Sequence, residues 1–142
     1  MIDSKMLLSG AFGYLYAAKW IAESKNGPAG LWPPFFDCIC CAIETSLKGY
    51  MVHHGATEGE CKNQVGHCLQ KAVDGACRLG MTKPDWDILR LIKKVAPHHK
   101  SRSFIYLSSI DVTSFPDFEP TLATTSRLLD EIFLQLPDLI PT

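Results

Sequence analysis

The most constraining feature of the sequence is a continuous apolar stripe between residues 34 and 54. At about 100° per residue, its members fall within about 120° of a helical wheel. Pro34 suits a first helical turn, and Gly55 provides a C-terminal stop. The segment therefore predicts the central core helix, with this inward set: Phe36, Ile39, Cys40, Ile43, Leu47, Tyr50, Met51 and His54.

Four further helices are predicted by apolar residues at three- and four-residue spacing. They cover about residues 4–25, 66–79, 82–95 and 119–136, and a short turn of helix is expected around residues 57–63. In the first helix the predicted inward stripe is Leu7, Ala11, Tyr14, Ala18 and Ile21, and a second apolar side is formed by Phe12, Tyr16 and Trp20. Two apolar sides indicate a helix that is sandwiched or at an interface.

Two segments break the helical pattern. Residues 26–34 combine glycines and prolines and predict a connecting loop. Pro97 is expected to end the helix before it, and residues 97–120 show no helical period. We expect a packed, partly extended loop there, in which a strand or hairpin is possible.

The length of 142 residues, with 46% hydrophobic residues, suits one domain core. The sequence therefore predicts a single all-α domain over residues 1–142, with a long, partly extended loop before the last helix.

Six cysteines and an apolar N-terminal stretch raise the question of secretion. Cys38, Cys40 and Cys41 crowd one predicted helix, where neighbours cannot bridge each other, so reduced core thiols are expected. Residues 6–18 lack charge, but their tyrosines and glycines fit a first helix better than a signal peptide. No run reaches the roughly 18 apolar residues of a membrane span. We predict a soluble, cytoplasmic protein with no membrane association.

A metal site is suggested by five soft or imidazole ligands within 16 positions: His53, His54, Cys61, His67 and Cys68. Zinc ligands usually come in short Cys-x(2–4)-Cys or His-x(3–5)-His pairs, and this set matches neither spacing. The prediction is that the chain has no metal and no cofactor.

The net charge of −1 and the pI of about 6.5 exclude the basic surface of a general nucleic-acid binder, so such binding needs a local patch. Residues 83–102 carry a charge of +4 and residues 103–142 a charge of −5, and the two stretches are candidates to face each other. An aromatic ring among cations suits phosphate or RNA. The alternative is a solvated face that the acidic segment partly neutralises. The candidate binding residues are Trp86, Arg90, Lys93 and Lys94 on one predicted helix face, and Lys100 and Arg102 after it.

The segment Glu44-Thr-Ser-Leu47-Lys48, which runs on to Gly55 and is followed by His67-Cys-Leu69, resembles the HEPN (higher eukaryotes and prokaryotes nucleotide-binding) family. The resemblance implies an antiparallel four- to five-helix up-and-down bundle that is often dimeric. It also implies one of two functions. Some members are metal-independent ribonucleases of toxin–antitoxin or defence systems, and others are noncatalytic nucleotide- or RNA-associated modules that partner a nucleotidyltransferase.

The ribonuclease members carry an Arg-x(4–6)-His motif that this chain lacks. Arg90 and His98 have seven residues between them, which is too many for the motif. Lys48 and His53 have the right spacing, but a lysine stands in place of the arginine and cannot make its planar bidentate contact to phosphate. The chain is therefore predicted to be noncatalytic. If it is an enzyme, the candidates are His67 or His98 as acid/base and Arg90 or Arg102 at the phosphorane.

Two polar features of the resembling segment have a structural and a functional interpretation. Glu44 and Lys48 form an i, i+4 pair that is either a helix-side ion pair worth a few tenths of a kcal/mol or a ligand-contacting pair in a bundle groove. His67 either joins a helix start to a neighbouring carbonyl or acts as a base.

These observations together predict a noncatalytic nucleotide-, RNA- or protein-binding adaptor module that forms a homodimer through the second side of the first helix or the long loop. The alternatives are a divergent metal-independent ribonuclease and a purely structural protein-interaction domain.

Overall fold

The computed structural model describes residues 3–24, 32–101 and 115–139. Within these ranges the chain forms helices and no strand, so the predicted all-α class is confirmed for the described residues. The elements are α1 (Ser4–Ala22), α2 (Trp32–His53), the π-helix η1 (Glu60–Val65), α3 (Leu69–Arg78), α4 (Trp86–Lys100), α6 (Phe118–Leu134) and the 3₁₀ turn η3 (Pro137–Leu139).

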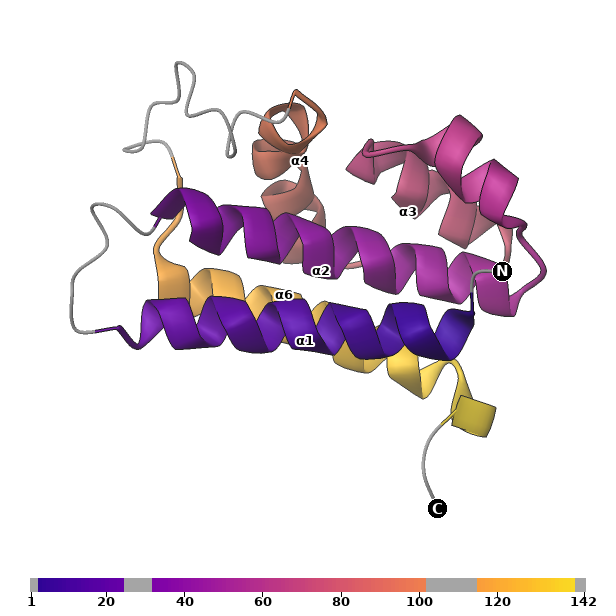
Figure 1. Ribbon diagram of the computed structural model, residues 1–142, viewed down its shortest axis with the longest axis horizontal. Coiled ribbons are helices and arrows are strands. Elements are labelled where there is room, and N and C mark those ends of the chain that lie inside the picture. The colour runs from indigo at the N-terminus through magenta and orange to yellow at the C-terminus, as the bar shows by residue number, and fades with distance from the viewer. Residues whose placement is uncertain (1–2, 25–31, 102–114, 140–142) are drawn as a thin grey trace.

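Helix α2 is the centre of the molecule, as its apolar stripe predicts. It contacts α1, α3, α4 and α6, and Figure 1 shows α1 and α6 on one side of it and α3 and α4 on the other. Its predicted inward residues from Phe36 to Met51 are all buried. His54 is the exception, because α2 ends at His53 and leaves His54 exposed in the turn that follows. The up-and-down topology of the helices stays a prediction.

The inward face of α1 differs from the predicted stripe. Leu8, Ala11 and Ala18 are buried, whereas the predicted Tyr14 is exposed. The reason is the close approach of α1 to α2 at Gly49, where a Cβ atom would lie 2.9 Å from the Leu8 Cγ. A glycine there lets Leu8 pack on the α2 backbone, and this contact sets the rotation of α1.

Helix α4 continues through Pro97, so the prediction that Pro97 ends it is wrong. Proline in a helix loses one backbone hydrogen bond and crowds the preceding turn. Position 97 lies in the last turns of α4, and the Ser101 N–H still donates to the Pro97 carbonyl at 3.1 Å. The last turn of α4 therefore carries His98, His99 and Lys100.

The segment between α2 and α3 contains more regular structure than the short turn of helix predicted around residues 57–63. It contains the π-helix η1, and α3 begins at Leu69 rather than near Gly66. His67 consequently lies in a turn before α3 and not on the helix itself.

The predicted long loop over residues 97–120 is shorter in the structure. Residues 97–100 belong to α4 and residues 118–120 to α6, while residues 102–114, where a strand or hairpin was considered, lie outside the described residues. The entry to α6 is fixed by aromatic contacts, since Phe118 stacks on Phe35 with ring centroids 3.9 Å apart and Phe115 contacts Phe36 at 4.8 Å. No helix in the described part of the chain has the length and apolar character needed to span a membrane.

Candidate functional site

Two polar clusters lie on different sides of α4. We call the first the carboxylate cluster; it consists of Glu44, Lys48, His67 and His99 together with the carbonyl of Gly66. We call the second the basic cleft; it is lined by the α4 side chains Arg90 and Lys94 and by residues at the start of α6.

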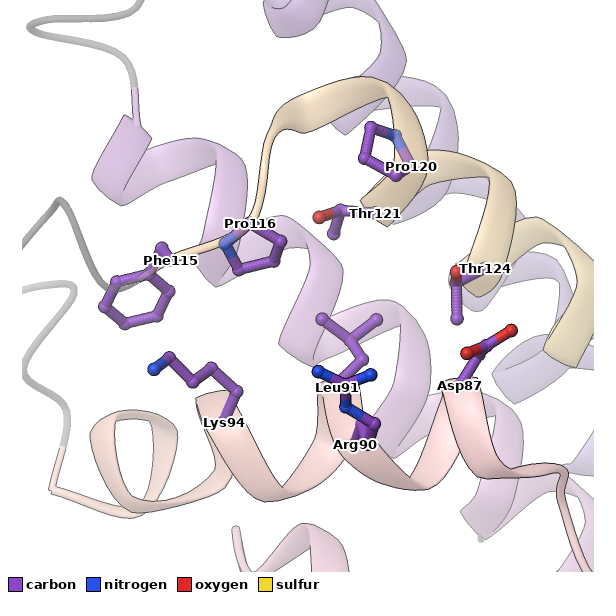
Figure 2. A pocket seen from close by; sticks show the side chains of 9 residues that line it. All are labelled: Asp87, Arg90, Leu91, Lys94, Phe115, Pro116, Pro120, Thr121 and Thr124. Atoms are coloured by element: carbon purple, nitrogen blue, oxygen red, sulfur yellow. The ribbon is translucent and has the colours of Figure 1, made fainter.

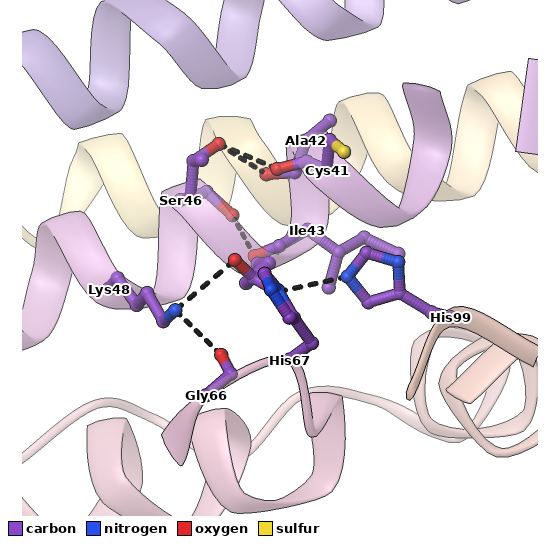
Figure 3. Close-up of polar contacts among 10 residues, drawn as sticks. Cys41, Ala42, Ile43, Ser46, Lys48, Gly66, His67 and His99 are labelled. Carbon is purple, nitrogen blue, oxygen red and sulfur yellow. Dashed lines mark hydrogen bonds and ion pairs between the residues drawn. The ribbon is translucent and has the colours of Figure 1, made fainter. Parts of the chain in front are cut away.

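The carboxylate cluster is centred on Glu44 of α2. One of its oxygens, Oε1, lies 2.9 Å from His67 Nδ1 and 2.9 Å from His99 Nε2. The other oxygen, Oε2, lies 3.2 Å from Lys48 Nζ, which also donates to the Gly66 carbonyl at 2.6 Å. Figure 3 shows Lys48, His67 and His99 converging: Lys48 comes from α2, His67 from the turn that precedes α3, and His99 from α4. Three segments distant in sequence, α2, the turn before α3 and the end of α4, thus meet at one carboxylate.

Local structure explains why each group points inward. Glu44 and Lys48 are one helical turn apart on α2, so their side chains lie on the same face. Gly66 has φ +58°, a left-handed conformation that side chains other than glycine rarely adopt. This conformation ends η1, lets the Gly66 carbonyl reach Lys48, and places His67 against Glu44. His99 reaches Glu44 because α4 continues past Pro97.

The electrostatics of Glu44 reflect these contacts. Burial alone would raise the pKa of Glu44, but the hydrogen bonds from His99 and His67 and the charge of Lys48 outweigh it and lower the pKa from 4.5 to about 2. Glu44 is therefore a carboxylate at any physiological pH. When neutral, an imidazole that donates from one ring nitrogen keeps the other as an acceptor.

Two sequence interpretations are corrected by this arrangement. Glu44 and Lys48 are not a solvated helix-side pair, because each side chain is only 11% exposed. His67 joins a carboxylate and not a carbonyl. The residue that sequence reasoning missed is His99, which is 2% exposed. Its signal was the spacing of four and seven residues from Val95 and Ile92 on the buried side of α4, obscured by the expectation that Pro97 ends the helix.

The cysteines and histidines singled out as possible metal ligands do not gather. His53 pairs with Asp138 at 3.3 Å, His54 is exposed, and Cys61 is buried. Among the described residues, one group of three has metal-ligating atoms close together. It is Glu44, His67 and His99, whose donor atoms all lie within 4.8 Å of one another.

The basic cleft has a volume of about 550 Å³ and lies between α4 and the start of α6. Figure 2 shows Arg90 and Lys94 on α4, facing the segment that leads into α6. An adjoining hollow of about 440 Å³ shares Arg90 and Lys94 and adds Trp86, Lys93 and His98. The described residues that line the cleft are Asp87, Arg90, Leu91, Lys94, Phe115, Pro116, Pro120, Thr121 and Thr124.

Some of the predicted binding residues lie together at the basic cleft and the adjoining hollow. Trp86 is 72% exposed, and Arg90, Lys93 and Lys94 are exposed beside it. Lys100 is also exposed, while Arg102 lies outside the described residues. Glu44 and Lys48 belong to the carboxylate cluster instead.

The acidic C-terminal stretch does not neutralise this face within the described ranges. No ion pair there joins an acidic side chain to Arg90, Lys93 or Lys94. The ion pairs that do join the two stretches use the arginine of the acidic stretch and aspartates of the basic one: Arg127 of α6 pairs with Asp85 at 2.9 Å and with Asp87 at 3.9 Å.

The two clusters are separated by α4 itself. Arg90 and His99 are nine residues apart, which corresponds to about 180° around a helix with 3.6 residues per turn. Arg90 is exposed and His99 is buried, as this angle requires. Among the candidate catalytic residues, His67 and Arg90 therefore do not share a cleft, and His98 lines the hollow beside Arg90.

We compared the chain with protein-family models, with curated proteins and with solved structures, and none of them matched it.

Proposed function

We propose that the chain is a noncatalytic binding module of HEPN-like type that takes a phosphate-bearing ligand, a nucleotide or single-stranded RNA, in the basic cleft. The observation that carries this proposal is the pairing of exposed cations with an aromatic ring in one concave site. Arg90 and Lys94 line the cleft together with Phe115.

The composition of the cleft suits such a ligand. Arg90 offers a planar guanidinium that can hold a phosphate through two hydrogen bonds, and Lys94 adds a second positive charge. Trp86, in the adjoining hollow, is an exposed ring of the kind on which bases stack. Among the described residues of the lining, Asp87 is the one acidic side chain, and Arg127 lies 3.9 Å from it.

The proposal is tested with purified protein, labelled single-stranded RNA and ATP in EDTA, with binding and cleavage scored across a range of salt concentrations. We expect salt-dependent binding without cleavage, and its loss in the double variant Arg90→Glu/Lys94→Glu. The matched control is Lys71→Glu/Arg78→Glu on α3, which changes the charge equally at two exposed positions outside the cleft. Unchanged affinity in the α4 variant would overturn the proposal, and an absence of binding in the wild type would favour a protein-interaction domain.

The ribonuclease alternative rests on one specific observation. Glu44 contacts Nδ1 of His67, and the His67 side chain is 53% exposed, so its other ring nitrogen can serve a substrate as a base. Lys48 is nearby, but its ammonium group is held by Glu44 and the Gly66 carbonyl. RNA cleavage in EDTA that disappears in His67→Ala would favour the ribonuclease over the binding module.

The proposal includes the antiparallel bundle of the HEPN family and a homodimer formed through α1. Support for the dimer comes from the outer face of α1, where Tyr16 is 75% and Trp20 is 62% exposed. Light scattering at micromolar concentration tests it: we expect the mass of two chains, reduced to one chain by Tyr16→Glu/Trp20→Glu. A monomeric wild type would contradict the dimer.

A further inference from the structure

We propose that Glu44, His67 and His99 bind one divalent transition-metal ion of the zinc class. This inference uses the carboxylate cluster and does not rest on the function proposed for the basic cleft.

The donor set is the first argument. Two imidazoles and one carboxylate are a common protein ligand set for zinc when a fourth position is left to water or substrate. The three residues come from α2, the turn after η1, and the last turn of α4. Their donor atoms lie within 4.8 Å of one another.

The distances are close to those that a metal needs. Ligands bonded at 2.0–2.1 Å to a tetrahedral zinc ion lie about 3.3 Å apart. Both histidine nitrogens are now 2.9 Å from Glu44 Oε1, so each of these contacts must lengthen by a few tenths of an ångström, while donor atoms of the set that lie up to 4.8 Å apart must approach each other. His67 can supply this movement because it lies in a turn, whereas Glu44 and His99 are fixed on helices.

The protonation change on binding is small. Each neutral imidazole now points an N–H at Oε1, and it binds a metal once that proton moves to its other ring nitrogen. No net proton loss is required when both imidazoles are neutral.

Lys48 has two effects on this site. Lys48 Nζ lies 3.2 Å from Oε2 and leaves Oε1 to the histidines, so it orients the carboxylate, as hydrogen bonds to metal ligands do in other sites. Its positive charge also weakens the binding of a cation, which favours borderline metals that bond strongly to imidazole over Mg²⁺ or Ca²⁺.

Among the described residues of the site, His67 is the most exposed to solvent. The His99 side chain is buried and the His67 side chain is half exposed, so an ion enters past His67. This asymmetry makes His67 the best residue to change, since its replacement disturbs the core least.

The experiment is a titration of the metal-free full chain with Co²⁺, read by visible absorption, and with Zn²⁺, read by calorimetry and by the shift in Tm. We expect one ion per chain and a rise in Tm on binding. His67→Gln is expected to lower the affinity for both ions at least about tenfold. Mg²⁺ is expected to produce no shift.

The matched control is His54→Gln, which removes an exposed histidine that belongs to the sequence cluster of possible ligands but lies outside this site. It should bind like the wild type. Circular dichroism of the metal-free variants checks that His67→Gln is folded. The proposal is overturned if the wild type binds no stoichiometric ion, or if a folded His67→Gln binds as tightly as His54→Gln does. RNA binding in EDTA is measured separately, so failure of the metal site and failure of the binding module are distinguishable.

Discussion

His99 Nε2 lies 2.9 Å from Glu44 Oε1, a hydrogen bond that spans 55 positions of sequence and links α4 to the central helix α2. The same oxygen faces His67, and the other carboxylate oxygen faces Lys48. Removing a partner of such a buried carboxylate leaves its charge less compensated and destabilises the fold. The cluster therefore contributes both to the stability of the fold and to its dependence on pH.

The first prediction concerns acid stability. The pKa of Glu44 is lowered from 4.5 to about 2 in the folded state. Its stabilising contribution is therefore complete above about pH 4.5 and is lost as the pH falls toward 2. A shift of this size corresponds to roughly 3 kcal/mol. We expect Glu44→Gln to be less stable than the wild type near pH 6 and similar to it near pH 2.

Urea unfolding of both proteins across this range measures the difference. The matched control is Glu119→Gln, which removes an exposed carboxylate at the start of α6. A Glu44→Gln penalty that stays constant from about pH 6 to about pH 2 would contradict the assignment of the acid dependence to Glu44.

The second prediction concerns the Glu44 and Lys48 pair. Removing one partner of a buried ion pair typically costs about 3–5 kcal/mol, whereas exposed i, i+4 pairs are worth about 0.3–0.5 kcal/mol. Both side chains are 11% exposed, so we expect Lys48→Met to cost about 3 kcal/mol. A double-mutant cycle with Glu44→Gln should give a coupling of at least about 1 kcal/mol.

The same cycle on Arg127 and Glu131 provides the comparison. This i, i+4 pair is 3.9 Å apart, and each side chain is 42% exposed. We expect a coupling of at most about 0.5 kcal/mol there. Equal couplings in the two cycles would mean that burial of the Glu44 pair has no energetic consequence.

The third prediction concerns the backbone that positions His67. Gly66 has φ +58° and ψ −127°, a region that L residues rarely populate, and a side chain there costs about 1–3 kcal/mol. We expect Gly66→Ala to lower the free energy of unfolding by this amount. Gly13→Ala on α1 is the control, because a Cβ there meets nothing within 4 Å and a glycine inside a helix is less stable than alanine by about 0.5–1 kcal/mol. The two variants should therefore change the denaturation midpoint in opposite directions, and a stabilised Gly66→Ala would refute the role of the left-handed conformation.

The fourth prediction quantifies the proposed phosphate contacts. Each phosphate neutralised on single-stranded RNA contributes about 0.7 to the slope of log affinity against log salt. We expect Arg90→Gln/Lys94→Gln, which removes two such contacts, to reduce the magnitude of this slope by about 1.4. Fluorescence anisotropy at several salt concentrations measures it, with Lys71→Gln/Arg78→Gln on α3 as the charge-matched control. If both variants reduce the slope equally, the binding depends on overall charge and not on the cleft.

The sequence determined the helices more reliably than their ends or their rotation. The stripe from Phe36 to Met51 predicted the buried face of α2, because the helical period is encoded locally and apolar side chains must be covered. Boundaries were predicted less well. The effect of Pro97 depends on how many hydrogen bonds of α4 remain, and the inward face of α1 depends on where Gly49 admits Leu8.

The candidate sites divide in the same way. The basic face of α4 follows from spacing within one helix, so Trp86, Arg90, Lys93 and Lys94 could be grouped from the sequence. The carboxylate cluster could not, although Glu44, Lys48 and His67 were each singled out. Its hydrogen bonds to His67 and His99 span 23 and 55 positions, and such contacts arise from the packing of α2, α4 and the turn at Gly66. Local patterns determine which side chains a helix presents, and only the tertiary structure decides which of them meet.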